Sequence, residues 1–131
     1  MPLISILIPT LLSRQAQFNQ LLAVLGPQLT SEVELISILD NRSMKLGEKR
    51  NTMMRACRGQ YLVHLDDDDL VRPNFIQEIV TAAQSGADVI AYDSAAYLED
   101  AEPFRVRTSL KFENQQVTKG AGGKWIDITR K

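Results

Sequence analysis

Short apolar runs alternate with longer amphipathic stretches along the chain from Leu3 to Tyr92. Four of the runs have the length and β-branched content of buried strands, which predicts strands at 3–8, 33–39, 60–65 and 88–92. Apolar residues at helical spacing predict helices at 15–29, 46–57 and 73–85, and Gly59 is expected to cap the second of these. Such alternation is typical of an α/β fold with a mostly parallel sheet, right-handed crossovers and helices over its faces.

The pattern changes beyond Ser94. Partial alternation predicts an edge strand over 104–112, the glycine-rich stretch 119–124 predicts a flexible turn, and a last short strand is predicted over 125–129. Neither a linker nor an internal repeat interrupts the chain, so residues 1–131 are predicted to form a single domain.

Composition places the chain among ordinary globular domains. Of its 131 residues, 44% are apolar and 24% charged, which excludes collagen-like, coiled-coil and wholly disordered chains. The net charge of −1 gives no indication of nucleic-acid or membrane binding, and a single cysteine, Cys57, excludes an intrachain disulfide. No apolar run approaches the ~20 residues of a membrane-spanning helix, and the N-terminus lacks signal-peptide features, so a cytoplasmic location is predicted.

The balanced total conceals two oppositely charged segments. Six basic residues and one acid lie from Arg42 to Arg58, and four consecutive aspartates follow at 66–69. This combination suits an anionic ligand that is bound together with a divalent cation. The alternative is that both segments are solvated faces of helices and loops.

The polar clusters follow the predicted strands. Three strands end at Pro9 and Thr10, at Asp40 and Asn41, and at the aspartates 66–69. Because ligands of open α/β sheets bind at the carboxyl ends of the strands, these residues are expected to form one site. Adjacent carboxylates repel one another, and a hard cation such as Mg²⁺ or Mn²⁺, held together with substrate phosphates, relieves that repulsion. The alternative is an acidic loop in which one aspartate caps the next helix.

Five segments carry a family resemblance through their order and spacing. They are ISILIPT at 4–10, LISIL at 35–39 followed by DNRS at 40–43, GEKRN at 47–51, ACRGQY at 56–61, and LDDDDL at 65–70 followed by Pro73. Over about residues 3–98 the chain thereby resembles family 2 glycosyltransferases of the GT-A fold. The resemblance implies a Rossmann-like, three-layer α/β sandwich that binds a nucleotide-diphosphate sugar, with a UDP-sugar favoured.

The resemblance also implies roles for individual residues. Donor-nucleotide contacts are implied for Pro9, Thr10, Asp40, Arg50, Asn51, Asp66 and Asp67. Asp40 matches the position that hydrogen-bonds the base, although the usual second acid is Asn41 here and the usual glycine is Arg42. Arg50 and Asn51 match the pair near the diphosphate and sugar, and Lys49 is adjacent and available to assist.

The aspartates at 66, 67 and 68 cover the family's DXD motif. The resemblance implies a metal site for Mn²⁺ or Mg²⁺ in which Asp68 is the direct ligand and Asp66 faces ribose or metal-bound water. Asp69 is expected to cap the next helix. In the implied reaction, the metal and Arg50 stabilise charge that develops on the departing diphosphate.

The reaction also needs an acceptor, which the sequence does not identify. An inverting enzyme of this family takes its carboxylate base from the second half of the domain, and no residue of this chain is assigned to that role. With 131 residues, the chain is expected to cover the donor-binding half and to stop before the acceptor side. An incomplete sheet edge would then make a homo-oligomer plausible.

Two other functions stay open from the sequence. One is a non-catalytic module that keeps donor binding and lacks the acceptor half. The other is a sugar-phosphate nucleotidyltransferase, which shares the sheet architecture. That class expects a glycine-rich loop after the first strand, and residues 10–14 contain no glycine, which disfavours it.

Overall fold

The computed structural model describes residues 1–97, 99–100, 102–108, 116–120 and 123–128. The chain divides into two compact units, Met1–Ala87 and Asp88–Lys131. The first unit contains β1 (Ile4–Leu11), α1 (Gln15–Leu25), β2 (Val33–Asp40), α2 (Leu46–Ala56), β3 (Tyr61–His64) and α3 (Phe75–Ala83). Short 3₁₀ turns follow β1 at Leu12–Arg14 and α1 at Gly26–Gln28.

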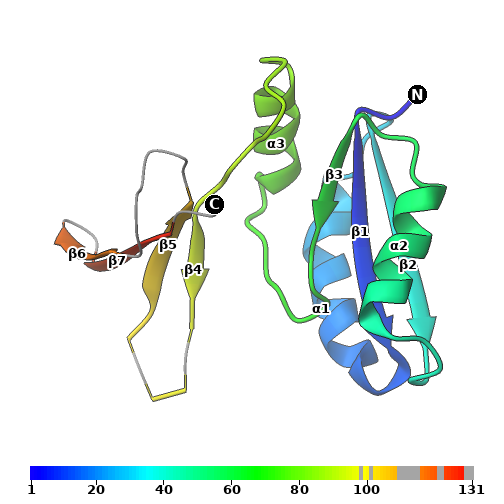
Figure 1. Ribbon diagram of the computed structural model, residues 1–131, viewed down its shortest axis with the longest axis horizontal. Coiled ribbons are helices and arrows are strands. Elements are labelled where there is room, and N and C mark those ends of the chain that lie inside the picture. Colours follow the sequence, from blue (N-terminus) through cyan, green and yellow to red (C-terminus); the bar gives the residue numbers. More distant parts are fainter. Residues whose placement is uncertain (98, 101, 109–115, 121–122, 129–131) are drawn as a thin grey trace. The chain divides into compact units, whose positions relative to one another are not determined.

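A parallel sheet with the strand order β2-β1-β3 forms the centre of the first unit (Figure 1). Ile4 of β1 lies opposite Val33 of β2 and Tyr61 of β3, which sets the register of the sheet. The chain steps from β1 to β2 and then returns across β1 to reach β3, so right-handed crossovers place α1 and α2 on opposite faces. Figure 1 shows this arrangement, which confirms the predicted α/β class.

The central strand supplies most of the buried core. Every residue from 4 to 10 is buried, as expected for a strand that is covered on both faces. Leu21 of α1 and Met53 of α2 are fully buried beside it. Pro9 is accommodated because β3 pairs with β1 only as far as Leu7, so Pro9 lies beyond the stretch that has a strand on both sides.

Gly59 marks a close approach of two backbone segments. The prediction that it caps a helix is wrong, because α2 ends at Ala56 with Cys57 as its extended cap residue. The amide of Gly59 donates to Ser5 Oγ at 2.8 Å. A Cβ at position 59 would lie 2.5 Å from the backbone nitrogen of Ser5, so only glycine lets the chain enter β3 at this distance from β1.

A carboxylate network fastens the amino ends of β1 and β2 to the loop after α2. Glu34 Oε1 accepts hydrogen bonds from Ser5 Oγ at 2.7 Å and from the backbone amide of Arg58 at 2.6 Å. The guanidinium of Arg58 donates to Glu34 Oε2 from Nε at 3.1 Å and from Nη2 at 3.0 Å. These hydrogen bonds, that of Ser5 above all, lower the pKa of Glu34 from 4.5 to about 2.

Glu34→Gln is expected to reduce the loss of stability in acid. The pKa of Glu34 falls from 4.5 to about 2 on folding, so its ionised form stabilises the fold above about pH 4.5. That contribution disappears as the pH falls toward 2. Between about pH 5 and about pH 2, the thermal midpoint measured by circular dichroism should therefore fall less in the variant than in the wild type. Glu48→Gln, on the exposed side of α2, is the control, and equal falls in the wild type and Glu34→Gln would contradict the prediction.

The structure departs from the predicted pattern after α3. The predicted strand at 88–92 is wrong: these residues are irregular, and the side chain of Val89 is 82% exposed. An apolar run becomes a strand only where a neighbouring strand edge receives it, and the sequence of the run does not specify that edge.

The second unit contains a four-stranded sheet of its own. Its order is β4-β5-β7-β6, with β4 at Ser94–Ala96, β5 at Phe104–Thr108, β6 at Gln116–Gly120 and β7 at Gly123–Ile128. The strand predicted over 104–112 is confirmed over β5, but its predicted edge position is wrong, because β5 pairs with β4 on one side and with β7 on the other. The predicted last strand is confirmed over β7, while residues 109–112 and 129 lie outside the described residues. Both ends of the predicted turn at 119–124 belong to β6 and β7. That the two units form a single domain stays a prediction.

In the described part of the chain, none of the helices combines the length and the apolar character that crossing a membrane requires.

Candidate functional site

A cavity of about 380 Å³ lies at the carboxyl end of the parallel sheet. Its walls come from the end of β1, the turn after β1, the loop that leads into α2, the first turn of α2 and the loop after β3. The lining residues are Pro9, Thr10, Leu11, Arg14, Arg42, Met44, Leu46, Lys49, Asp66, Asp67 and Asp68. The volume is that of a small-molecule site, at the edge where open α/β sheets bind their ligands.

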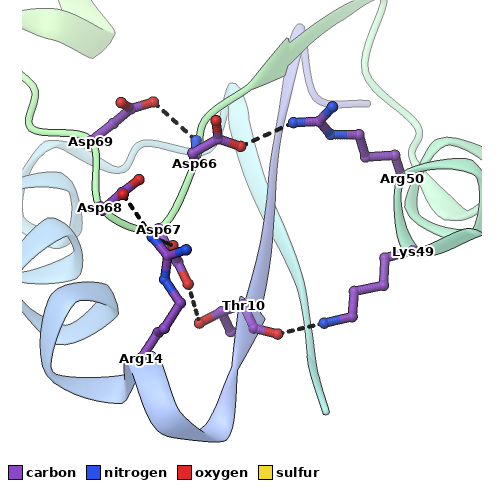
Figure 2. A network of polar contacts seen from close by, with 8 residues as sticks. All are labelled: Thr10, Arg14, Lys49, Arg50, Asp66, Asp67, Asp68 and Asp69. Atoms are coloured by element: carbon purple, nitrogen blue, oxygen red, sulfur yellow. Dashed lines mark hydrogen bonds and ion pairs between the residues drawn. The ribbon is translucent and has the colours of Figure 1, made fainter. Parts of the chain in front are cut away.

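The aspartates that line the cavity lie in contrasting environments (Figure 2). The side chain of Asp67 is 5% exposed, and its Oδ2 accepts a hydrogen bond from Thr10 Oγ1 at 2.9 Å. Asp66 and Asp68, on either side of it, are 56% and 57% exposed. Asp67 therefore anchors the loop to β1, whereas its two neighbours present carboxylates to the cavity and to solvent.

Asp69 closes a turn within the same run. Its Oδ2 accepts a hydrogen bond from the backbone amide of Asp66 at 3.0 Å, and its own amide donates to the Asp66 carbonyl at 3.0 Å. The prediction that Asp69 caps the next helix is wrong, because α3 begins only at Phe75 and its N-cap position is Asn74. The segment between the aspartates at 66–69 and α3 is therefore longer than the sequence pattern predicts.

Two arginines neutralise the exposed carboxylates (Figure 2). Arg14 Nη2 lies 2.8 Å from Asp67 Oδ1 and 2.7 Å from Asp68 Oδ2. Arg50 Nη2 lies 3.0 Å from Asp66 Oδ1. The repulsion among adjacent carboxylates is thus relieved by side chains of the chain itself.

Lys49 is a buried cation that ties three elements together at the site. Its side chain is 3% exposed, its Nζ donates to the Thr10 carbonyl at 2.6 Å, and it forms an ion pair with Asp40. Asp40 Oδ2 also accepts hydrogen bonds from Ser43 Oγ at 3.0 Å and from the Met44 amide at 2.8 Å. The contact with Lys49 is the main cause that lowers the pKa of Asp40 from 3.8 to about 2.

Two further features complete the electrostatics of the site. Arg42, which is one of the residues that line the cavity, has a backbone φ of 62°, in the left-handed region that favours glycine. The left-handed conformation gives a physical reason for the glycine that the family resemblance places here, and a non-glycine residue costs about 1 kcal/mol. Partial burial, and then the charge of Arg50, lower the pKa of His64 from its ordinary value, which disfavours the charged form of this histidine.

The structure brings most of the predicted site residues together. The cavity is lined by Pro9, Thr10, Asp66, Asp67 and Asp68. Asp40 and Arg50 lie outside the lining and contact it through Lys49 and Asp66, respectively, and Asn51 is exposed on α2. The ligands assigned to these residues stay predictions.

Sequence reasoning missed Arg14. Helical spacing gives no indication that a residue in the turn before α1 reaches the loop after β3, which lies more than fifty positions away in sequence. The available signal was charge balance, because four adjacent carboxylates require counter-ions and Arg14 is the first basic residue after β1.

The carboxylates suit a divalent cation in one mode of binding. Among the described residues, no group of three or more His, Cys, Asp or Glu side chains is arranged to enclose a metal. Asp66 and Asp68 nevertheless present two half-exposed carboxylates at one cavity. Mg²⁺ is usually held by one or two carboxylates and by substrate phosphates, so the residues fit a cation that is shared with a phosphate-bearing ligand.

Comparison with known proteins settles the family. The family model described as "Glycosyl transferase family 2" matches residues 28–128. The chain belongs to glycosyl transferase family 2. This membership, together with the parallel sheet, confirms the predicted GT-A (Rossmann-like) fold class.

A more distant similarity agrees with the family. The chain is 27% identical over 63 residues to the protein named "Putative glycosyltransferase EpsH" from Bacillus subtilis (strain 168). The matched segment covers 48% of this family 2 chain and 18% of that relative, so the match spans less than a fifth of the relative's length. No solved structure matches the chain.

Proposed function

We propose that this family 2 chain binds a nucleotide-diphosphate sugar in the cavity and takes part in transfer of the sugar to an acceptor hydroxyl. The observation that carries the proposal is a cavity of suitable size, with cations and carboxylates side by side, at the strand ends of a family 2 fold. Guanidinium groups bind phosphate oxygens in bidentate fashion, and Arg14 and Arg42 both line the cavity.

Each part of the donor has proposed contacts in the chain. The nucleotide lies against Pro9 and Thr10 at the end of β1, with its base toward Asp40. Arg50 and Asn51 of α2 serve the diphosphate and the sugar. A UDP-sugar is the favoured donor. The supporting observation is that β1, β2 and the loop after β3 converge at this edge of the sheet.

The carboxylates have a separate role in the proposal. Asp68 holds a divalent cation, Mn²⁺ or Mg²⁺, with Asp66 as the second residue of the metal site. When bound, such a cation stabilises negative charge on the departing diphosphate. Asp67, which is buried against Thr10 and Arg14, keeps the loop and its neighbouring carboxylates in position. Arg50 balances the charge of Asp66 through an ion pair. Self-association and a cytoplasmic location stay predictions.

Titration of the chain with UDP tests the donor site. UDP is expected to bind at least about 100-fold more tightly with Mn²⁺ than in the presence of EDTA, because a cation held by carboxylates contributes ligand positions for phosphate oxygens. Isothermal titration calorimetry measures both affinities, and parallel titrations with CDP and GDP compare the bases.

Two results, one from this titration and one from an activity assay with UDP-sugars, would change the proposal. If no nucleoside diphosphate binds in the presence of either Mn²⁺ or Mg²⁺, the donor site is wrong. If UDP binds with metal but UDP-sugars are neither transferred nor hydrolysed, the result favours the non-catalytic binding module.

A further inference from the structure

Arg14 holds carboxylates of two successive aspartates with one nitrogen atom. Its Nη2 lies 2.8 Å from Asp67 Oδ1 and 2.7 Å from Asp68 Oδ2, as Figure 2 shows. Both contacts are charge-assisted and short, which makes them stronger than neutral hydrogen bonds. The guanidinium therefore stands at the carboxylate that is proposed to bind a cation.

The two partners of Arg14 are unequal. Asp67 is buried, and its other oxygen is held by Thr10, so this half of the contact is fixed to β1. Asp68 is 57% exposed, and the side chain of Arg14 is 38% exposed. An ion pair that water reaches in this way contributes little stability, so the contact with Asp68 exchanges easily while that with Asp67 persists.

The cavity lining carries balanced charges, and this balance bears on what the contact between Arg14 and Asp68 does. The lining contains three acids, Asp66, Asp67 and Asp68, and three bases, Arg14, Arg42 and Lys49. Such a lining attracts neither a lone cation nor a lone anion strongly. A cation and an anion that enter together keep the balance, provided that a basic side chain moves from a carboxylate to the anion.

We propose that Arg14 is a built-in counter-ion that couples cation binding at Asp68 to anion binding in the cavity. The proposal rests on the proposed function and deepens it. While the guanidinium binds Asp68 Oδ2, that oxygen is already occupied, and the positive charge of Arg14 repels a divalent cation that approaches Asp68. A diphosphate in the cavity offers the guanidinium a bidentate partner and frees the carboxylate. Because coupling between two sites is reciprocal, metal and diphosphate each raise the affinity of the other.

The test compares Mn²⁺ binding in the wild type and in Arg14→Gln, first without any nucleotide. Free Mn²⁺ is measured by electron paramagnetic resonance. Arg14→Gln is expected to bind Mn²⁺ alone about tenfold more tightly, because the competing positive charge is removed. The factor by which UDP tightens Mn²⁺ binding is expected to shrink accordingly. Arg14→Lys, which keeps a cation without the fork of donors, should lie between the two.

A control variant shows whether the effect on Mn²⁺ affinity is specific to Arg14. Arg55→Gln removes the same charge from the exposed part of α2 and is expected to leave Mn²⁺ affinity within about twofold of the wild type. Unchanged Mn²⁺ affinity in Arg14→Gln, or an equal gain in Arg55→Gln, would overturn the inference. Circular dichroism checks the fold. If Arg14→Gln does not fold, Arg14→Lys supplies the comparison: a gain in Mn²⁺ affinity smaller than about tenfold is expected, and unchanged affinity would overturn the inference.

Failure of the inference is distinguishable from failure of the proposed function. If the wild type binds UDP with Mn²⁺ and Arg14→Gln does not change Mn²⁺ affinity, only the role of Arg14 is wrong. If UDP does not bind at all, the donor site is wrong, and the titrations with Mn²⁺ alone still report on Arg14.

Discussion

Lys49→Met is expected to destabilise the chain by about 3 kcal/mol, the cost of removing one partner of a buried ion pair. The side chain of Lys49 is 3% exposed, and methionine fills a similar volume without a charge or a donor. The substitution would leave the Asp40 carboxylate without its cation and the Thr10 carbonyl without the hydrogen bond that it accepts at 2.6 Å. Urea unfolding at pH 7, followed by circular dichroism, measures the loss.

The lysine four positions earlier offers a matched control. Lys45 is exposed at the start of α2, so Lys45→Met should change the free energy of unfolding by less than about 0.5 kcal/mol. Adding Asp40→Asn to Lys49→Met should recover part of the loss, since the buried carboxylate no longer carries an unpaired charge. A loss in Lys49→Met no larger than in Lys45→Met would show that Lys49 does not hold the site together.

The sequence predicts the parallel sheet because local pattern and topology agree. The run at 3–8 is apolar at nearly every position, which is typical of a strand that is buried on both faces, and β1 is such a strand. Once the strands are parallel, their carboxyl ends share one edge, so the positions of Thr10 and of the aspartates at 66, 67 and 68 follow without any knowledge of side-chain contacts.

Features that depend on contacts between distant segments were beyond the sequence. A cap and a close backbone approach both require a missing Cβ, so the pattern did not distinguish the two roles for Gly59. The partners of Arg14 depend on the path of the turn at Leu12–Arg14, which hydrophobic periodicity does not describe. The strand predicted at 88–92 failed for a related reason, because strand formation requires a partner edge as well as an apolar run.

Asp68→Ala is expected to weaken UDP binding in the presence of Mn²⁺ by about 100-fold, or about 2.7 kcal/mol, and not to weaken binding in EDTA. Asp68 is the proposed direct metal ligand, and its side chain is 57% exposed, so the fold does not depend on its burial. Arg14 keeps Asp67 as a partner in the variant, which preserves the anchor between the loop and the turn after β1. Calorimetric titrations with UDP, with Mn²⁺ and with EDTA, measure the difference.

Asp69→Ala is the matched control because it removes the same charge from the same run of aspartates. Asp69 contacts the backbone amide of Asp66 and lies outside the cavity lining, so Mn²⁺-dependent UDP binding should persist in this variant. If the two variants lose affinity equally, the run acts through its total charge and Asp68 is no specific ligand. If Asp68→Ala binds UDP with Mn²⁺ as the wild type does, the run serves only to shape the loop between β3 and α3, and the proposed metal site is wrong.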